Sequence, residues 1–332
     1  MRIWQWLLGL LISILALYGA IRGLDLPTLW AALQTGDYGW LPPALLALTL
    51  SVAARAARWR ILLNEPHGVS FFRLWNVLNV GYLVTHLLPF RMGELARVLL
   101  LARYPQTPPG LVAMSIVVEH VLDLVAVLML AGLALIARPE ALGLQILSWA
   151  GLGLTVGGLL VLLVGAFRPN WAWRLTEWLT QPLPGLLREP LRREARAALS
   201  GLEVLRTPRA LAGALGWSLA AWVAAGSQLY AVMEIFLTHP DWLPALWTMT
   251  ALTFGMLVPS TPGYIGVVQG ITVWVMGGFG IPHATAFSIS VVSHALIYFY
   301  LSLLGALGLW LETGSLRLSF LRKGGGHYGS TE

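Results

Sequence analysis

Long hydrophobic runs follow one another along the whole chain, and mostly short polar segments separate them. A helix needs roughly 20 mostly apolar residues to cross a bilayer, and six of the runs come near or exceed that length. They predict spanning helices at about 3–21, 40–58, 111–137, 144–167, 211–237 and 284–311. Because no large polar block interrupts this pattern, we expect an all-α polytopic membrane protein with about six spanning helices.

Two further apolar stretches are interrupted near their centres and do not fit single spans. Residues 74–103 are broken at Pro89 to Arg91, and residues 243–279 are broken at the segment PSTPGYIG, residues 259–266. Proline and glycine end helices, and short interrupted hydrophobic segments are typical of re-entrant helices. The sequence therefore predicts two broken re-entrant hairpins, with structural elbows at Pro89, Gly93, Pro259, Pro262, Gly263 and Gly266.

The basic residues predict how the chain is oriented. Only 11% of the residues are charged, against about 25% in soluble domains, and the net charge is +6. Cytoplasmic loops of membrane proteins carry an excess of Arg and Lys. With both termini in the cytoplasm, and with the first hairpin entering and leaving on one side, Arg55 and Arg58 fall inside. The Arg- and Trp-rich segment 168–209 then lies inside too, where it suits an amphipathic segment on the membrane surface.

The spans and hairpins also predict an internal symmetry. The integral membrane domain, residues 1–316, divides into halves of about 1–137 and 144–312, each with three spans and one hairpin. Three crossings are an odd number, so the second half is expected to be inverted relative to the first. Inverted repeats with broken helices are typical of transporters with a site near the mid-plane. Residues 317–332 are expected to be a flexible cytoplasmic tail.

Charged residues in the first broken segment are the first candidates for binding chemistry. The stretch PFRMGELAR carries Arg91, Glu94 and Arg97, and VVEHVLDL in the next span carries Glu119 and Asp123. Charges at bilayer depth are costly and normally pair, so Arg91 or Arg97 is the expected partner of the two acids. The forked donors of Arg also suit phosphate. Two interpretations remain open: a headgroup-binding site, or ion pairs that fasten the hairpin.

The second broken segment offers uncharged polar groups. Hydroxyls of Ser260 and Thr261 and the amide of Gln269 are candidates for substrate binding. His120 and His294 are candidates for a proton relay, although an isolated histidine such as His120 is more often a satisfied interior group, and His294 is equally compatible with a packing role. We expect no metal site and no cofactor. No catalytic motif is present, so we do not expect an enzyme, and dispersed Arg residues argue against nucleic-acid binding.

The segments PFRMGELAR, VVEHVLD and PSTPGYIGVVQG, in this order, resemble the lysylphosphatidylglycerol synthase transmembrane family, also called flippase-like membrane proteins. The resemblance covers roughly residues 1–312 and implies lipid translocation. The chain looks like a stand-alone membrane half without an aminoacyltransferase domain. Four positions depart from the usual family residues, which are often Arg, Gly, Glu and Arg where this chain has His120, Tyr264, Gln269 and His294.

Three functions follow as hypotheses. The leading one is a flippase or scramblase in the cell membrane that moves a phospholipid, glycolipid or polyprenyl-phosphate-linked lipid, with an anionic or phosphate-bearing headgroup as its partner. One alternative is an ion- or proton-coupled carrier of a soluble anion. Another is a non-transporting membrane partner of a lipid-modifying enzyme or glycosyltransferase. The sequence indicates no oligomeric state.

Overall fold

The computed structural model describes residues 3–63, 69–88, 91–104, 107–137, 145–256 and 261–314, and this part of the chain is helical, with no strand. The predicted tail, residues 317–332, lies outside the described residues. All six predicted spans are present as helices: α1 Ile3–Ile21, α3 Leu41–Leu62, α6 Pro109–Ala137, α7 Gln145–Phe167, α10 Pro208–Phe236 and α13 His283–Thr313. The all-α fold class is therefore confirmed.

Four of these helices, α3, α6, α10 and α13, are long and apolar enough to cross a membrane. The number rises to five if α7 and the following helix α8, Pro169–Thr180, are one broken span. This count of candidate spans covers only the residues whose side chains are described, and these do not include the first part of α1. The remaining short elements are α2 Leu26–Thr35, η1 Tyr38–Trp40, α9 Gly185–Ser200 and η3 Glu203–Arg206.

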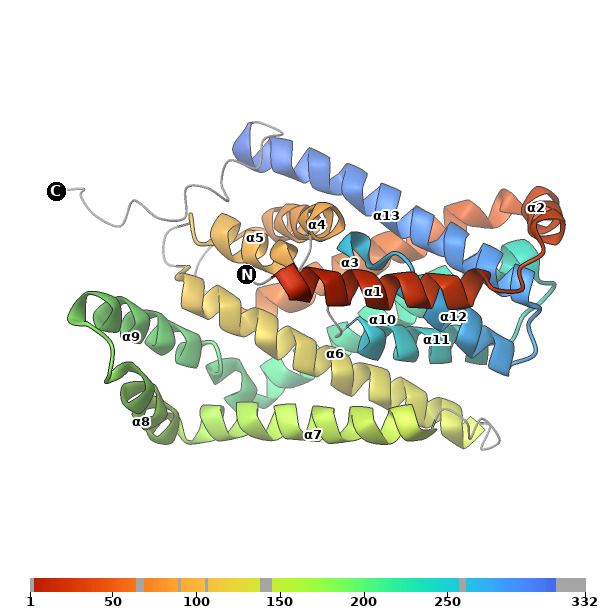
Figure 1. The fold of residues 1–332 in the computed structure, drawn as a ribbon. Coiled ribbons are helices and arrows are strands. Elements are labelled where there is room, and N and C mark those ends of the chain that lie inside the picture. The colour runs from red at the N-terminus through yellow and green to blue at the C-terminus, as the bar shows by residue number, and fades with distance from the viewer. Residues whose placement is uncertain are drawn as a thin grey trace.

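The long helices run side by side, with α3 packed along α10 and α13 packed along the first helix of the first broken segment, α4, Phe71–Leu87 (Figure 1). The start of α1 and the end of α13 lie at the same end of the bundle as α8 and α9 (Figure 1). Helix α2 lies at the opposite end. Local sequence sets the helix ends: Pro208 occupies the first turn of α10, and Gly314 follows α13 in a left-handed conformation with φ 65°.

The first broken segment forms two helices, as predicted. Helix α4 ends at Leu87, and α5 spans Met92–Leu101. Between them Arg91 adopts φ 53°, in the left-handed region that ends regular helix geometry. Pro89 lies outside the described residues. Gly93 allows the close packing of α5 on α4, because a Cβ atom there would lie 2.0 Å from the carbonyl oxygen of Gly81.

The second broken segment is also divided as predicted, into α11, Trp242–Gly255, and α12, Val267–Gly278, with the short helix η4, Pro262–Tyr264, between them. Gly263 and Gly266 adopt positive φ angles of 67° and 92°. A Cβ atom on Gly266 would lie 2.3 Å from the carbonyl oxygen of Ser13, so glycine also lets this elbow press against α1. Pro259 and Ser260 lie outside the described residues.

The two hairpins extend from opposite ends of the bundle. In Figure 1, α4 and α5 lie toward the end that carries α8 and α9, and α11 and α12 lie toward the end that carries α2. The η4 elbow packs against α4, so the two breaks meet inside the bundle. This arrangement agrees with the expectation of opposed hairpins. The inverted repeat itself stays a prediction.

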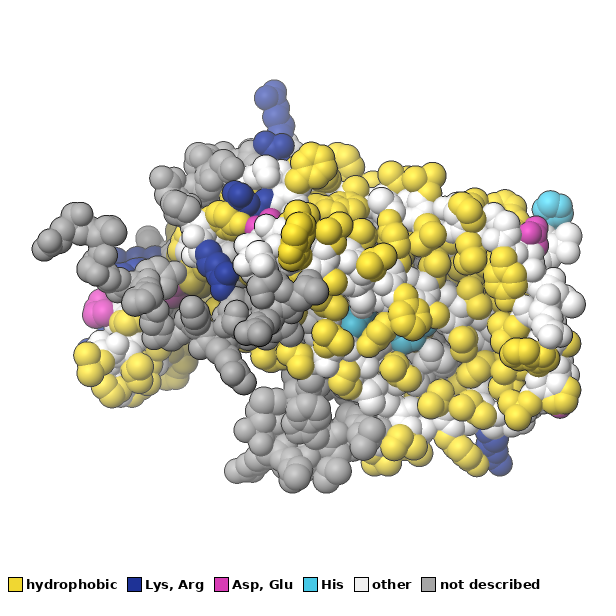
Figure 2. Space-filling view, turned by 90° about the horizontal axis from the view of Figure 1, so that it is seen from above, with side chains coloured by type: hydrophobic (Ala, Val, Ile, Leu, Met, Phe, Trp, Pro, Cys, Tyr) yellow, Lys and Arg dark blue, Asp and Glu magenta, His cyan; other side chains and the backbone are white. Residues whose placement is uncertain are grey.

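The Arg- and Trp-rich segment 168–209 leaves the bundle abruptly. Helix α8 is bent by 99° from α7, and α9 returns to pack on α6, where the amide of Gly110 donates to Glu194 at 2.7 Å. Trp171 and Trp178 are exposed. Figure 2 shows hydrophobic side chains over most of the bundle, whereas the described basic side chains gather mainly at the end with α8 and α9.

Gly93→Ala should destabilise the protein, because the added methyl group has no space between α4 and α5. Overpacking of this kind typically costs about 1–3 kcal/mol. The measurement is thermal unfolding of the purified protein in detergent. Gly277→Ala on α12 is the matched control, since a Cβ atom there meets nothing within 4 Å. Equal unfolding midpoints for the two variants would contradict the packing of the first hairpin.

Candidate functional site

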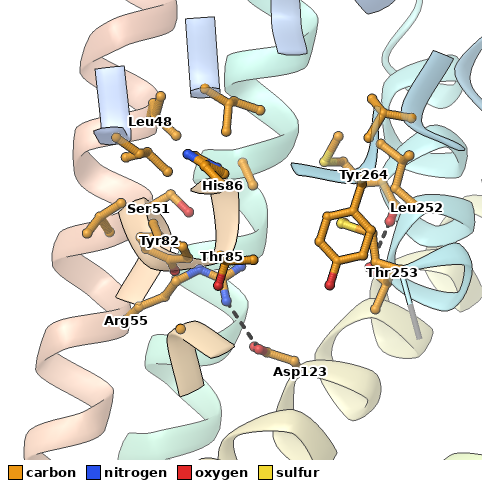
Figure 3. A pocket seen from close by; sticks show the side chains of 18 of the residues that line it. Leu48, Ser51, Arg55, Tyr82, Thr85, His86, Asp123, Leu252, Thr253 and Tyr264 are labelled. Carbon is orange, nitrogen blue, oxygen red and sulfur yellow. Dashed lines mark hydrogen bonds and ion pairs between the residues drawn. The ribbon is translucent and has the colours of Figure 1, made fainter. Parts of the chain in front are cut away.

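A cavity of about 350 Å³ lies where the two hairpins meet the long helices. Its walls come from both hairpins and from α3, α6, α10 and α13. Most of the lining is apolar, with side chains such as Leu48, Leu229 and Met249. Charged and polar side chains lie among them, and Figure 3 shows the Tyr264 ring facing Thr85 across the open space. The cavity therefore offers both apolar and ionic surfaces inside a membrane bundle.

A network of ion pairs joins α3, α5 and α6 beside this cavity. Arg97 on α5 donates to both carboxylate oxygens of Glu119 on α6, at 2.7 and 3.3 Å. Arg58 on α3 lies 3.1 Å from Glu119 and also pairs with Asp123. Arg55, one turn earlier on α3, donates to Asp123 at 3.1 Å, as Figure 3 shows. Arg58 is fully buried, so ion pairs and hydrogen bonds within the protein replace its water.

Tryptophan rings complete the surroundings of these arginines. The guanidinium carbon of Arg97 lies 4.2 Å from the ring centre of Trp59, and that of Arg55 lies 5.0 Å from Trp222. The Trp222 indole N–H donates to Asp123 at 2.8 Å. Cation–π contacts strengthen when the cation is removed from water. We infer that these groups fasten three helices together, because the charged ends of Arg58, Arg97, Glu119 and Asp123 are already occupied by one another.

The sequence predicts that Arg91 or Arg97 pairs with Glu119 and Asp123. The pair of Arg97 with Glu119 is confirmed. The prediction is wrong for Asp123, which pairs with Arg55 and Arg58.

The distribution of basic residues predicts Arg55 and Arg58 on the cytoplasmic side, at the end of the second span. Instead α3 continues to Leu62, so both arginines lie inside the helix on the face toward α6. Basic residues near the end of an apolar run give the same sequence pattern whether their side chains are exposed to water or buried in the protein. The one signal that could have distinguished them was the excess of acid over base in the facing span.

A second charged group lies at the first elbow and is half-exposed. Arg91 Nη1 lies 3.3 Å from Glu94 Oε1, and His120 Nε2–H donates to the same oxygen at 3.0 Å. The side chains of Arg91, Glu94 and His120 are 33%, 36% and 38% exposed. The expectation that Arg91 could pair with Glu119 or Asp123 was wrong, because its left-handed elbow turns it toward the second hairpin. These three side chains line the cavity and remain accessible.

Arg91 links the two elbows. Its Nε–H donates to the Tyr264 hydroxyl at 3.1 Å, and its Nη2 donates to the carbonyl oxygen of Met256 at 2.9 Å. Tyr264 follows Gly263 in η4, and Met256 directly follows α11. The contact therefore joins residues 165 or more positions apart in the chain. Sequence spacing alone gave no sign of this contact.

His294 is committed to the second elbow. The amide N–H of Gly266 donates to Gln269 Oε1 at 2.8 Å, so the Gln269 NH2 group is the one that faces His294 Nδ1, at 2.9 Å. The other ring nitrogen donates to the carbonyl oxygen of Gly263 at 2.8 Å. Because Nδ1 accepts and Nε2 donates, the ring is held neutral, and both nitrogens are in use. His294 therefore braces the elbow, which leaves His120 as the more accessible of the two candidate relay residues.

The other predicted binding residues also brace this elbow. Thr261 donates its hydroxyl to the carbonyl oxygen of Ile265 at 2.9 Å, and its amide donates to Ser13 on α1 at 3.1 Å. Neither Thr261 nor Gln269 is among the described residues that line the cavity. Ser260 lies outside the described residues. Of the predicted binding and relay residues, the structure thus brings seven to the cavity and leaves Thr261 and Gln269 outside its lining: the seven are Arg91, Glu94, Arg97, Glu119, His120, Asp123 and His294.

The four positions that depart from the family pattern lie at two places in the structure, one at each elbow. Gln269 and His294 hydrogen-bond to each other, where the resemblance implies Glu and Arg. His120 bonds to Glu94, and Tyr264 bonds to Arg91, which itself pairs with Glu94. A neutral pair thus occupies the position of an expected ion pair at the second elbow. At the first elbow, the charged Arg91 bonds to Tyr264 and the charged Glu94 bonds to His120.

Glu119→Gln should be strongly destabilising. It removes the only ion-pair partner that Arg97 has among the described residues, and it leaves a buried cation unpaired. Breaking a buried pair in this way costs about 3–5 kcal/mol. The measurement is the free energy of unfolding in a detergent denaturation series.

The control is Glu189→Gln on the exposed face of α9, where the carboxylate lies 3.9 Å from Arg192. Exposed pairs contribute about 1 kcal/mol or less. A loss at Glu119 no larger than the loss at Glu189 would show that the network does not fasten the helices.

Comparison with known proteins agrees with the resemblance seen in the sequence. None of the curated proteins compared with the chain matches it. A family model described as the lysylphosphatidylglycerol synthase TM region matches residues 6–305, which includes both hairpins and the cavity. The protein is therefore a membrane protein of the lysylphosphatidylglycerol synthase transmembrane family.

Proposed function

We propose that this protein moves a lipid between the leaflets of the cell membrane, as a flippase or scramblase. The observation that carries the proposal is the cavity between two opposed hairpins, in which a half-exposed Arg91 lies beside mostly apolar walls. A lipid presents the same combination of an ionic headgroup and apolar chains. Each hairpin enters from a different end of the bundle, so the site between them could be reached from either leaflet (Figure 1).

The charges favour an anionic or phosphate-bearing headgroup. Four arginines and three carboxylates meet at or beside the cavity, which leaves an excess of one positive charge. Arg91 is the arginine most accessible to a ligand, because the others are more deeply buried against Glu119 and Asp123. The planar donor edge of Arg suits phosphate oxygens. Phospholipids, glycolipids linked through phosphate and polyprenyl phosphates all meet this requirement.

Each group at the first elbow has a role in this proposal. Arg91 holds a phosphate oxygen of the headgroup. Glu94 orients Arg91 and His120, and its own carboxylate disfavours a second anion in the same place. Both termini and the α8–α9 segment lie on the cytoplasmic side, as the distribution of arginines predicts. The chemistry required is binding and movement, and no covalent step is proposed.

The alternative functions receive less support from this geometry. A proton-coupled carrier was expected to use Glu119, Asp123, His120 and His294. Both acids are engaged with arginines, and His294 is held by two hydrogen bonds, so His120 alone keeps an exposed titratable ring. A non-transporting partner of a lipid-modifying enzyme agrees with the fastening role of the buried network. It gives no reason for a mostly apolar cavity between the two hairpins.

The test is leaflet exchange of fluorescent phosphatidylglycerol in liposomes that contain the purified protein, read by dithionite quenching with and without a pH gradient. Arg91→Ala and Glu94→Ala should each slow exchange about tenfold or more, since each loses a hydrogen bond to a charged group. Arg209→Ala and Glu189→Ala, at exposed positions outside the cavity, are the matched controls and should exchange at the wild-type rate.

Wild-type exchange in both elbow variants would exclude this site as the headgroup site. No exchange above empty liposomes in the wild-type protein, together with uptake of a soluble phosphate ester, would favour the carrier. Co-purification with a lipid-modifying enzyme whose activity requires the protein, without either form of transport, would favour the partner role.

A further inference from the structure

The donor edge of Arg91 that faces the second hairpin is already occupied by two protein oxygens. Nε and Nη2 form one edge of the planar guanidinium group, and they donate to Tyr264 Oη at 3.1 Å and to the Met256 carbonyl oxygen at 2.9 Å. Two oxygens bound side by side are what a phosphate group offers to this edge of an arginine. The protein therefore supplies from its own second elbow the ligands that a headgroup would supply.

The backbone at this contact is unusual on both sides. Arg91 has φ 53° and Tyr264 has φ 58°, a conformation that L residues other than Asn and Asp rarely adopt. Glycine would occupy either position without strain. At position 264 the side chain reaches Arg91 with its hydroxyl, and no other hydrogen bond of that hydroxyl is found among the described residues. The two residues with strained backbones are thus the same two whose side chains join the hairpins.

The contact also lies in the wall of the cavity, because Arg91 and Tyr264 both line it. Tyr264 lines it from one side, and Figure 3 shows the Tyr264 ring opposite Tyr82, Thr85 and His86. Arg91 and Tyr264 come from different hairpins, so their bond bridges the two elbows. Separation of the two side chains would break the hydrogen bond between η4 and the first elbow while the buried Arg97–Glu119 pair remains in place.

We propose that the Tyr264 hydroxyl, with the Met256 carbonyl, is an internal competitor for phosphate oxygens at Arg91. Without ligand the Arg91–Tyr264 bond holds the two elbows together. A phosphate-bearing headgroup takes the Nε/Nη2 edge of Arg91, Tyr264 is released, and the elbows separate. Headgroup binding is thereby coupled to opening of the path between the hairpins. This inference rests on the proposed function, because it identifies which part of Arg91 the headgroup uses.

The experiment measures the distance between the elbows directly. The chain has no cysteine, so cysteines introduced at the exposed positions Leu87 and Ile265 can be spin-labelled without background. The protein is studied in maltoside micelles with no addition, with phosphatidylglycerol, with diacylglycerol of the same acyl chains, or with inorganic phosphate. Phosphatidylglycerol should lengthen the distance, and diacylglycerol should leave it unchanged.

Tyr264→Phe removes only the competing hydroxyl. It should shift the distance distribution toward the long form without lipid and lower the phosphatidylglycerol concentration for half-maximal opening about tenfold. Tyr300→Phe is the matched control, because its hydroxyl bonds to Thr49 at 2.8 Å, away from the elbows. Arg91→Lys, which keeps the charge and loses the two-donor edge, should also open the elbows without lipid.

A wild-type distance and a wild-type lipid response in both Tyr264→Phe and Arg91→Lys would overturn the inference. If that occurs while leaflet exchange still depends on Arg91, the proposed function stands and only the competition fails. If the distances respond as expected but no leaflet exchange is found, the competition at Arg91 is supported and the proposed lipid movement is rejected. Opening by inorganic phosphate alone would support the competition and identify free phosphate as sufficient.

Discussion

The structure depends on the burial of charge inside an apolar bundle. Arg58 is fully buried between Glu119 and Asp123, and Arg97 closes the same network from the first hairpin. A charge removed from water is tolerated only when another charge and hydrogen bonds replace that water. The network therefore fixes α3, α5 and α6 relative to one another. Because α5 begins immediately after Arg91, it also fixes where the first elbow meets the second.

Two sets of arginines that look alike in the sequence have different tasks in this fold. Arg58 pairs with Glu119 and Asp123, and Arg97 pairs with Glu119 and lies against the Trp59 ring, so the donors of both arginines are engaged largely within the protein. Arg91 is half-exposed, and two of its three nitrogens contact neutral oxygens, which we propose a phosphate headgroup replaces. Under the proposed function, fastening and headgroup binding are therefore separated by burial. The elbow that divides α4 from α5 produces this separation, since it turns Arg91 away from the acids that hold Arg97.

The sequence predicted the helices and both breaks because these follow from local hydrophobic length and from proline and glycine. It also predicted that Arg91 or Arg97 would pair with the acids of the next span, and Arg97 does so with Glu119. It did not predict the inward role of Arg55 and Arg58, because a basic end of an apolar run has the same pattern in water and in a buried network. The Arg91–Tyr264 contact depends on how two distant hairpins meet. Tyr264 was noticed only as a departure from the family pattern, and its backbone conformation could not be read from residue types.

The most direct measurement compares two paired neutral replacements in the same leaflet-exchange assay, at equal amounts of folded protein. Arg97→Met with Glu119→Leu removes a buried pair without leaving Arg97 or Glu119 as an unpaired charge, and the account predicts that the folded variant still exchanges lipid. Arg91→Met with Glu94→Leu removes the accessible pair, and the account predicts a folded protein that has lost exchange. Exchange that survives the change at Arg91 and Glu94 but fails at Arg97 and Glu119 would contradict the separation of fastening from binding.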